Sequence, residues 1–113
     1  MTFEQINRRY EISLDTLYKF EEAGLFTNIK RIDQRYDFTD QDIENLSCIL
    51  SLYQIGMDLH DVNFFLDLKR QGDKTKAERV FMLKKIREKA LVDLHRKQKN
   101  LDCIDCMIYE LKK

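Results

Sequence analysis

A chain of 113 residues can form one domain, or one domain with an extension. It has no proline and only three glycines, and 35% of its residues are charged, a composition that favours helices almost throughout. Because no apolar run is long enough to span a membrane and the N-terminus does not resemble a signal peptide, we expect a cytoplasmic protein. Three cysteines, an odd number, favour free thiols over a disulfide framework.

The net charge is zero, but the charges are distributed unevenly. Residues 37–65 include six acidic side chains and no lysine or arginine, whereas residues 66–113 include fourteen basic and eight acidic ones. Residues 1–36 are balanced at six of each sign. Their cations are candidates for phosphate contacts, with a solvated surface position as the alternative for each: Arg8, Arg9, Lys19, Lys30, Arg31 and Arg35.

The most informative stretch is ISLDTLYKFEEAGLF at residues 12–26, which is typical of the second helix of a helix-turn-helix. Ser13 can cap its N-terminus, and Gly24 can end it in a left-handed conformation. Three apolar residues between them recur at helical spacing: Leu14, Leu17 and Phe20. Upstream, FEQINRRY predicts a short first helix with three inward residues: Phe3, Ile6 and Tyr10. Such a pair of helices can be a packing unit or a DNA-reading unit.

A wing and a second pair of helices are expected next. Residues 25–38 lack helical periodicity and favour a short two-stranded wing, with four candidate strand residues: Ile29, Ile32, Tyr36 and Phe38. Thr39 can cap a helix that ends at Gly56, and Asp58 can cap a helix that ends near Gly72. The apolar stripes of these two helices are Ile43, Leu46, Ile49, Leu50 and Tyr53, then Leu59, Val62, Phe65 and Leu66.

Residues 75–113 predict one long helix without an internal breaker. Its dimerisation seam follows a heptad frame: Val80, Leu83, Arg87, Ala90, Leu94, Lys97, Leu101, Ile104, Ile108 and Leu111. Arg87 and Lys97 interrupt the seam, as polar residues that fix register and partner do. Since so small a domain cannot cover this stripe, we expect a symmetric homodimer. A helix that folds back along its own chain is the alternative.

The order of these elements resembles the MerR family of bacterial transcription regulators. Three stretches carry the resemblance: SLDTLYKFEEAGL at residues 13–25, FTDQDIENL at 38–46 and LYQIGMDLHDVNFFL at 52–66. The fold implied is all-α with a small β wing. A winged helix-turn-helix domain would occupy residues 1–72, followed by a coiled-coil dimerisation helix at 73–113.

The resemblance implies a transcriptional regulator that binds a pseudo-palindromic promoter site as a homodimer and distorts the DNA. Its partners would be double-stranded DNA, a second copy of itself and RNA polymerase at the promoter, and it implies no cofactor. Tyr18 and Lys19 would make groove and phosphate contacts, and Arg35 and Tyr36 would act in the wing. The other residues of the implied interface are Ser13, Asp15, Thr16, Arg8, Arg9, Lys30 and Arg31.

The second helix of the predicted helix-turn-helix, which corresponds to the family's recognition helix, departs from the family in its charge. Family members usually carry a basic residue at the position of Asp15, an arginine at Tyr18 and a tyrosine at Lys19. A carboxylate such as that of Asp15 is useful against DNA mainly when it accepts a hydrogen bond from a cytosine amino group. A second function therefore stays open: a protein-interaction module that keeps the fold, binds DNA weakly or not at all, and modulates another regulator.

The turn and the wing depart as well. Glu11 stands where the family has glycine in the turn between the first two helices. In the wing, Arg35 and Tyr36 replace the family's glycine-tyrosine pair. The apolar core positions are unaffected by these differences, so the fold prediction does not depend on them.

Metal binding and catalysis receive little support from the sequence. Cys103 and Cys106 form a C-x-x-C, but they fall at the outer heptad positions c and f, and a closed zinc site needs four ligands. We expect no metal, with these two thiols as the weak candidates, and Cys48 as a small apolar residue beside a helix stripe. Because no phosphate-binding glycine loop or catalytic spacing is present, we expect a non-enzyme.

A ligand pocket is a further alternative. It would lie between the long helix and three aromatic residues whose other explanation is core packing: Phe64, Phe65 and Phe81.

Overall fold

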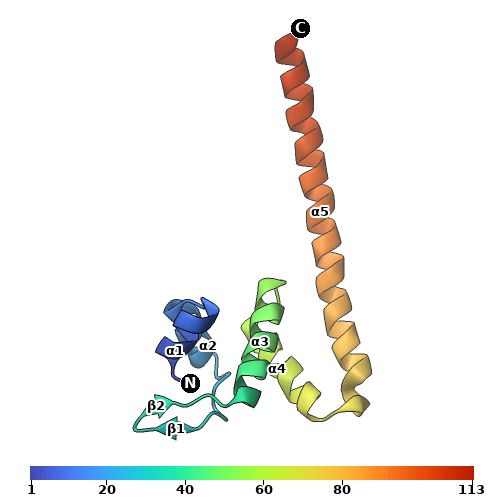
Figure 1. Cartoon of the computed structure of the whole chain (residues 1–113). Helices are drawn as coiled ribbons and strands as arrows, with labels where there is room; N and C mark the ends of the chain where they lie inside the picture. The colour runs from blue at the N-terminus through green and yellow to red at the C-terminus, as the bar shows by residue number, and fades with distance from the viewer.

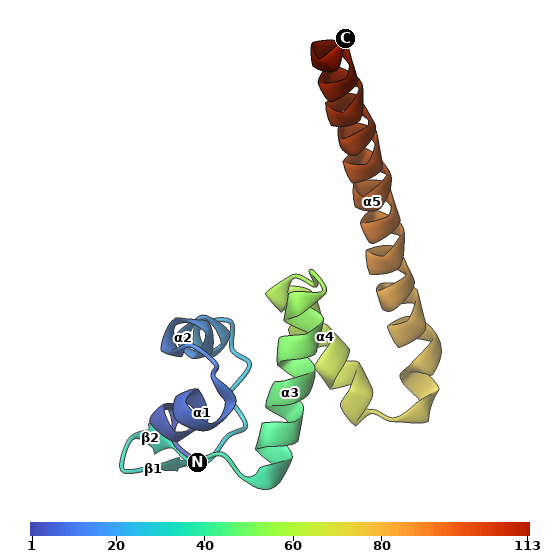
Figure 2. The ribbon, with the colours of Figure 1, turned by 45° about the horizontal axis from the view of Figure 1, so that its top comes forward.

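The computed structural model describes all residues from 1 to 113. A small globular unit holds four helices and a two-stranded wing, and a fifth helix stands away from it as a rod (Figures 1 and 2). The rod gives the molecule principal extents of 69 × 37 × 20 Å. The elements are α1 (Phe3–Tyr10), α2 (Leu14–Glu22), β1 (Arg31–Ile32), β2 (Arg35–Tyr36), α3 (Asp40–Gln54), α4 (Leu59–Arg70), the 3₁₀ turn η1 (Asp73–Thr75) and α5 (Lys76–Lys112).

Side-chain caps set the start of each helix in the globular unit. Thr2 and Thr39 form capping boxes with Gln5 and Asp42, in which each side chain bonds the other residue's backbone amide. Single caps begin the other two helices, at Ser13 and Asp58. The expected helix-ending glycines Gly24, Gly56 and Gly72 all have positive φ angles, from 79° to 100°.

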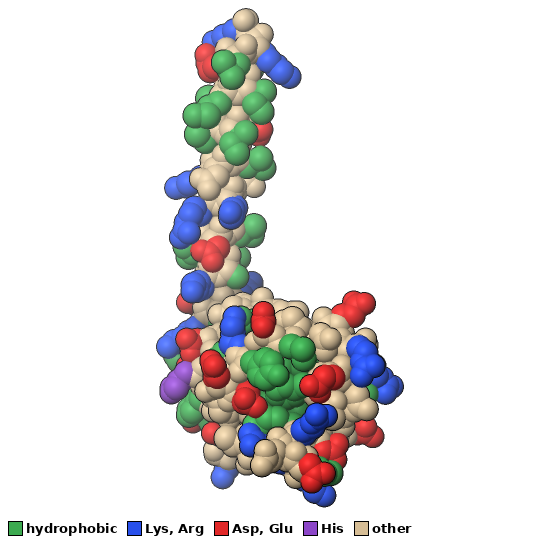
Figure 3. Space-filling model, turned by 90° about the vertical axis from the view of Figure 1, so that its left-hand side faces the viewer, with side chains coloured by type: hydrophobic (Ala, Val, Ile, Leu, Met, Phe, Trp, Pro, Cys, Tyr) green, Lys and Arg blue, Asp and Glu red, His purple; other side chains and the backbone are tan.

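α5 leaves the globular unit almost as soon as it begins. Near its N-terminal end, Met82 and Ile86 are partly buried against the core, and no residue of the helix is fully buried. Hydrophobic side chains remain uncovered along the rod (Figure 3), up to Leu111 with 86% of its surface exposed. The helix therefore does not fold back along its own chain. None of the helices, α5 included, combines the length and apolarity that a membrane crossing requires.

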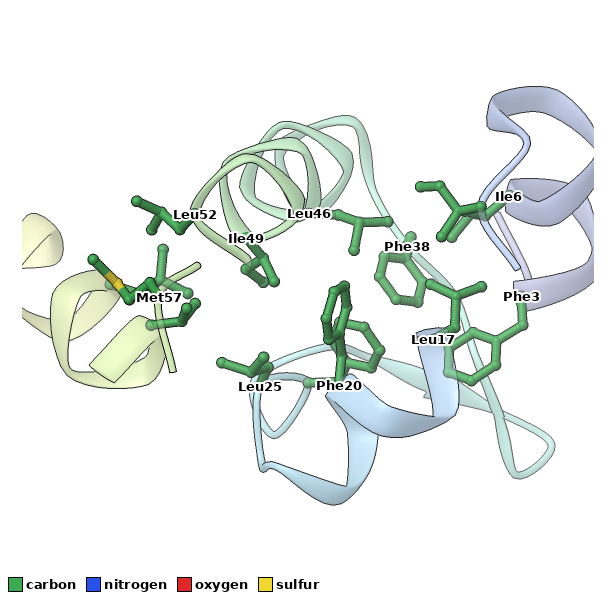
Figure 4. Close-up of a cluster of buried hydrophobic side chains, with 14 of the residues drawn as sticks. Phe3, Ile6, Leu17, Phe20, Leu25, Phe38, Leu46, Ile49, Leu52 and Met57 are labelled. Carbon is green, nitrogen blue, oxygen red and sulfur yellow. The ribbon is translucent and has the colours of Figure 1, made fainter. Parts of the chain in front are cut away.

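The core lies between the two helical pairs (Figure 4). Its largest fully buried side chains come from α1, α2, α3, α4 and the loop after α2: Phe20, Phe26, Ile6, Leu17, Leu46 and Val62. The buried side chains of Phe3, Phe26 and Phe38 lie in mutual aromatic contact, with ring centroids 5.1–5.9 Å apart. This contact binds the N-terminal helix to both ends of the wing loop.

The fold confirms the sequence prediction of an all-α chain with a β wing and a long terminal helix, but two details differ. Tyr10 is 44% exposed and does not face the core. Ile29 and Phe38 lie outside the strands, because only two residues of each strand are paired in the wing. Phe38 is instead buried in the core. Ile32 and Tyr36 lie in the strands as expected, and Ile32 is 49% exposed.

Candidate nucleic-acid interface

α2 presents one continuous exposed stripe to solvent. Asp15, Tyr18, Lys19 and Glu22 follow the i, i+3, i+4, i+7 spacing that places side chains on one helix face, and all four are exposed. The opposite face of α2 packs into the core. Two carboxylates and one ammonium give the stripe a formal charge of −1, so this stripe alone does not attract phosphates.

The turn before α2 holds the helix in place. Ser13 Oγ accepts a hydrogen bond from the Thr16 backbone amide at 3.1 Å and lies 2.7 Å from Thr16 Oγ1. Asn7 Nδ2 donates to the carbonyl oxygen of Ile12 at 2.8 Å, and Glu11 adopts the left-handed conformation with a φ of 57°. Ser13 and Thr16, two predicted DNA contacts, thus already serve the helix cap.

The one cation of α2 is directed towards α3. Lys19 Nζ donates to the hydroxyl oxygen of Tyr53 at 3.1 Å and lies 5.6 Å from the centroid of its ring. Tyr53 in turn packs edge-on against Phe20, with ring centroids 5.3 Å apart. Tyr53 of α3 therefore lies at the exposed surface beside α2.

A recess of about 320 Å³ lies between α2 and the wing. Tyr18 lines it from α2, and its ring meets Phe3 edge-on at 5.5 Å. The ring of Tyr36 also stacks on Phe3, with ring centroids 5.3 Å apart and an interplanar angle of 12°. Arg31 and Arg35 line the recess from the wing. α1 thus ties the aromatic residues of α2 and the wing into one surface.

The wing carries its cations on a short hairpin. Arg31 pairs with Tyr36 across the strands, and Arg31 Nη2 donates to the Tyr36 hydroxyl at 2.6 Å. This hydrogen bond raises the pKa of the Arg31 guanidinium, which is ionised at any physiological pH. Asp33 and Gln34 form the two-residue turn with φ angles of 51° and 67°, which are characteristic of a tight hairpin turn.

The remaining predicted cations are also exposed. Arg8 and Arg9 lie in the last turn of α1, where positive charge is favourable near the C-terminal end of a helix. Lys30 directly precedes β1. Acidic residues lie among these cations: Figure 3 shows Lys, Arg, Asp and Glu side chains mixed around a central hydrophobic patch on the side of α1, α2 and the wing.

The structure brings together four of the predicted contacts, Tyr18, Arg31, Arg35 and Tyr36, around the recess. The remaining predicted contacts lie elsewhere on α1, α2 and the start of the wing. Sequence reasoning missed several residues: Glu4 and Glu21, which line the recess, Glu22, which completes the stripe, and Tyr53. The spacing of Glu22 from Asp15 and Lys19 could have identified it, whereas no local pattern connects Tyr53 to α2.

Two other candidate sites lie away from this surface. A groove of about 460 Å³ between the α3–α4 turn and α5 is lined by Phe64 and Phe81, as the sequence suggested, while Phe65 is buried in the core. Cys103 and Cys106 are exposed on α5, and the structure contains no group of three or more His, Cys, Asp or Glu residues suited to a metal ion.

Comparison with known proteins identifies the architecture. No model of a known protein family matches the sequence, and no curated protein does either. Among solved structures, a MerR-family transcriptional regulator from Bacillus thuringiensis is 24% identical, with a TM-score of 0.72 and 97% of each chain covered. HiNmlR, a MerR-family regulator lacking the sensor domain and bound to promoter DNA, is 26% identical, with a TM-score of 0.70 over 95% of this chain and 86% of its own.

A third similar structure is a MerR-family protein from Listeria monocytogenes, 24% identical with a TM-score of 0.74, covering 96% of this chain and 83% of that one. The chain therefore has the fold of a winged helix-turn-helix regulator with a long terminal helix. More particularly, this is the fold of MerR-family transcriptional regulators, and the resemblance predicted from the sequence is confirmed.

Proposed function

We propose that this protein is a DNA-binding regulator of transcription that acts on a promoter as a homodimer. The observation that carries the proposal is the likeness of nearly the whole chain to HiNmlR, which is bound to promoter DNA. The geometry supports it, because the exposed stripe of α2 and the cations of the wing lie on either side of one recess. An α-helix fits the major groove, and a neighbouring wing can reach the flanking backbone.

The charges suggest how the contacts are divided. Arg31 and Arg35 of the wing are free of ion pairs with carboxylates and are suited to phosphates. Asp15 and Glu22 repel phosphates and so reduce non-specific affinity. Tyr18, 49% exposed beside the recess, offers a hydroxyl and a ring edge to the groove. Ser13, Thr16, Arg8, Arg9, Lys30 and Tyr36 would contribute positioning and backbone contacts.

The proposed dimer forms through α5. The seam from Val80 to Leu111 is uncovered in a single chain, and burying one large aliphatic side chain is worth about 1.5–3 kcal/mol. Residues 1–72 would then act as the DNA-binding unit and residues 73–113 as the dimerisation unit.

The two cations of the seam favour an antiparallel pair. In a parallel pair, Arg87 would face Arg87 and Lys97 would face Lys97 of the other copy, which repel each other. In an antiparallel pair with Val80 opposite Leu111, the same spacing places Arg87 opposite Ile104 and Lys97 opposite Leu94. Every layer then contains an apolar residue. The two globular units would then lie at opposite ends of the helix pair, related by the two-fold symmetry that the half-sites of a pseudo-palindrome also have.

Binding by two such units would distort the promoter DNA. RNA polymerase, the further partner, would then bind the distorted promoter. Bending a binding site costs about 1–6 kcal/mol, and because this cost depends on the DNA sequence it adds specificity at bases that are not contacted. This part of the proposal rests on the resemblance to the family.

The test is selection of bound sequences from random and genomic DNA fragments by the purified protein at low salt. A recovered inverted repeat, bound by two chains per site and released steeply by added salt, is the expected result. Replacing both Arg31 and Arg35 with Gln should reduce affinity for all sequences. Failure to enrich any sequence, with no binding even at low salt, contradicts the proposal.

A second function is favoured by one observation, the charge of −1 on the exposed stripe of α2. In this alternative the protein is an interaction module that binds another regulator through the same surface. It predicts no DNA binding at low salt by wild type, together with a loss of partner binding when Tyr18 is changed to Ala.

A further inference from the structure

Lys19 bonds a tyrosine hydroxyl although two carboxylates lie within its reach on the same helix. Lys19 has a carboxylate on each side along the same stripe, Asp15 four residues before it and Glu22 three residues after it. Both spacings allow ion pairs on a helix surface, yet Lys19 forms none. Its ammonium instead donates at 3.1 Å to the hydroxyl of Tyr53, which is 34 positions away in the sequence.

Tyr53 can hold this position because its own ring is fixed. It lies in the last turn of α3, is only partly exposed, and packs edge-on at 5.3 Å against Phe20, which is completely buried. The backbone after it is fixed as well, since the amide of Gly56 donates to the Tyr53 carbonyl at 3.1 Å. The hydroxyl is therefore a fixed point on the core, and the flexible lysine is the group that it restrains.

The contact leaves donors free on both side chains. A lysine ammonium has three N–H donors, and only one is used by Tyr53. The Tyr53 hydroxyl accepts from Lys19 and keeps its own hydrogen, for which the structure contains no acceptor. The Lys19 ammonium and the Tyr53 hydroxyl, from different helices, thus lie side by side at the edge of α2 as two hydrogen-bond donors. The ammonium also provides one positive charge.

We propose that Lys19 and Tyr53 together form a site for one DNA backbone phosphate, in which Tyr53 both donates to the phosphate and positions the lysine. This inference rests on the proposed DNA-binding function. A phosphate is favoured over a base edge because the ammonium is drawn from the middle of the stripe towards α3. Restraining the lysine before binding lowers the entropy that it loses on binding.

The experiment is a double-mutant cycle on a DNA fragment recovered by selection, with wild type, Lys19→Gln, Tyr53→Phe and the double variant. Affinities are measured by fluorescence anisotropy over a range of salt concentrations. Tyr53→Phe should weaken binding about three- to tenfold in wild type, and by less than about twofold when Lys19 is already Gln. Lys19→Gln should lower the salt slope by about one without changing the preferred sequence.

Tyr109→Phe is the matched control, because Tyr109 lies on α5 with 65% of its surface exposed and should have no effect. Equal losses from Tyr53→Phe in both backgrounds would mean a purely structural role and overturn the inference. An altered sequence preference in Lys19→Gln would mean base reading and overturn the phosphate site. If wild type binds no DNA, the proposed function itself fails; if wild type binds but the cycle shows no coupling, only this inference fails.

Discussion

The hydroxyl oxygen of Thr75 lies 2.6 Å from the carbonyl oxygen of Leu68, across the bend that joins α4 to α5. It also lies 2.8 Å from the Gly72 carbonyl oxygen and accepts from Arg79 Nε at 3.1 Å. Thr75 is the one buried polar residue of the chain, with 4% of its surface exposed. This small network fixes the direction in which α5 leaves the globular unit, and it would therefore set the placement of the two globular units in the proposed dimer.

Thr75→Val should destabilise the fold by about 1–3 kcal/mol, because it removes a buried hydroxyl that donates to the Leu68 and Gly72 carbonyl oxygens and accepts from Arg79 Nε. Thr75→Ser keeps the hydroxyl and should lose less. Urea unfolding followed by circular dichroism measures both. The control is Thr27→Val, at an exposed loop position where the hydroxyl makes no hydrogen bond. Equal stability of the Thr75 and Thr27 variants would show that the joint does not depend on this network.

The proposed dimer depends on the apolar seam of α5. Changing both Leu101 and Ile108 to Asp should convert a dimer at micromolar concentration into monomers, because each change buries a carboxylate opposite an apolar residue of the other copy. Sedimentation equilibrium gives the mass directly. Val92→Asp combined with Cys106→Asp adds the same charge at outer f positions of the heptad and should leave the dimer intact. A monomeric wild type contradicts the dimer itself.

The orientation of the pair can be measured separately. With the native cysteines changed to Ser, a spin label at Lys112→Cys marks the C-terminal end of α5. A helix of 37 residues is roughly 55 Å long at 1.5 Å per residue. In an antiparallel pair the two labels should lie about 45 Å or more apart, and in a parallel pair they should lie within about 25 Å. Pulsed electron–electron double resonance distinguishes these distances, and a distance within about 25 Å between the two labels would exclude the antiparallel arrangement.

Glu11→Gly should stabilise the protein by about 0.5–1 kcal/mol, because Glu11 occupies the left-handed region with a φ of 57°, where a side chain is unfavourable. Glu44→Gly is the matched control inside α3, where glycine should destabilise by about 1 kcal/mol. Thermal unfolding of the two variants should therefore shift in opposite directions. A loss of stability in Glu11→Gly would mean that the turn is not strained.

Local patterns predicted most of the fold, because helix caps, apolar spacing and left-handed glycines act over a few residues. Ser13 and Thr39 cap as expected, and Gly24 and Gly56 end their helices. The exposure of Tyr10 was not predictable from spacing, since it depends on how α1 is rotated against α2.

The candidate site was less predictable, because its geometry depends on long-range packing. Lys19 and Tyr53 are 34 residues apart, and the packing of α2 against α3, including the contact of Tyr53 with Phe20, brings them together. Likewise, Phe3 joins Tyr18 to Tyr36 through ring contacts that no sequence spacing reveals. Glu22 is the exception, since its helical spacing from Asp15 was visible in the sequence.

Asp15→Arg is the sharpest test of how the recognition helix meets DNA. Asp15 is exposed in the first turn of α2 and has no hydrogen-bond or ion-pair partner for its carboxylate, so its main effect on DNA is repulsion of phosphates. We expect arginine to tighten binding to all duplex sequences and to steepen the salt slope by about one. The fold should lose only about 0.3–1 kcal/mol from the change of charge near the helix N-terminus.

Asp102→Arg makes the same charge change on α5, far from α2, and should leave the salt slope almost unchanged. Anisotropy titrations of the three proteins against specific and random duplexes provide the comparison. If arginine at position 15 instead changes which sequence is preferred, Asp15 reads a base, and a cytosine amino group is the natural partner for its carboxylate. If wild type and Asp15→Arg both fail to bind any duplex at low salt, the interaction-module function replaces DNA binding, because neither form of the stripe then recognises nucleic acid.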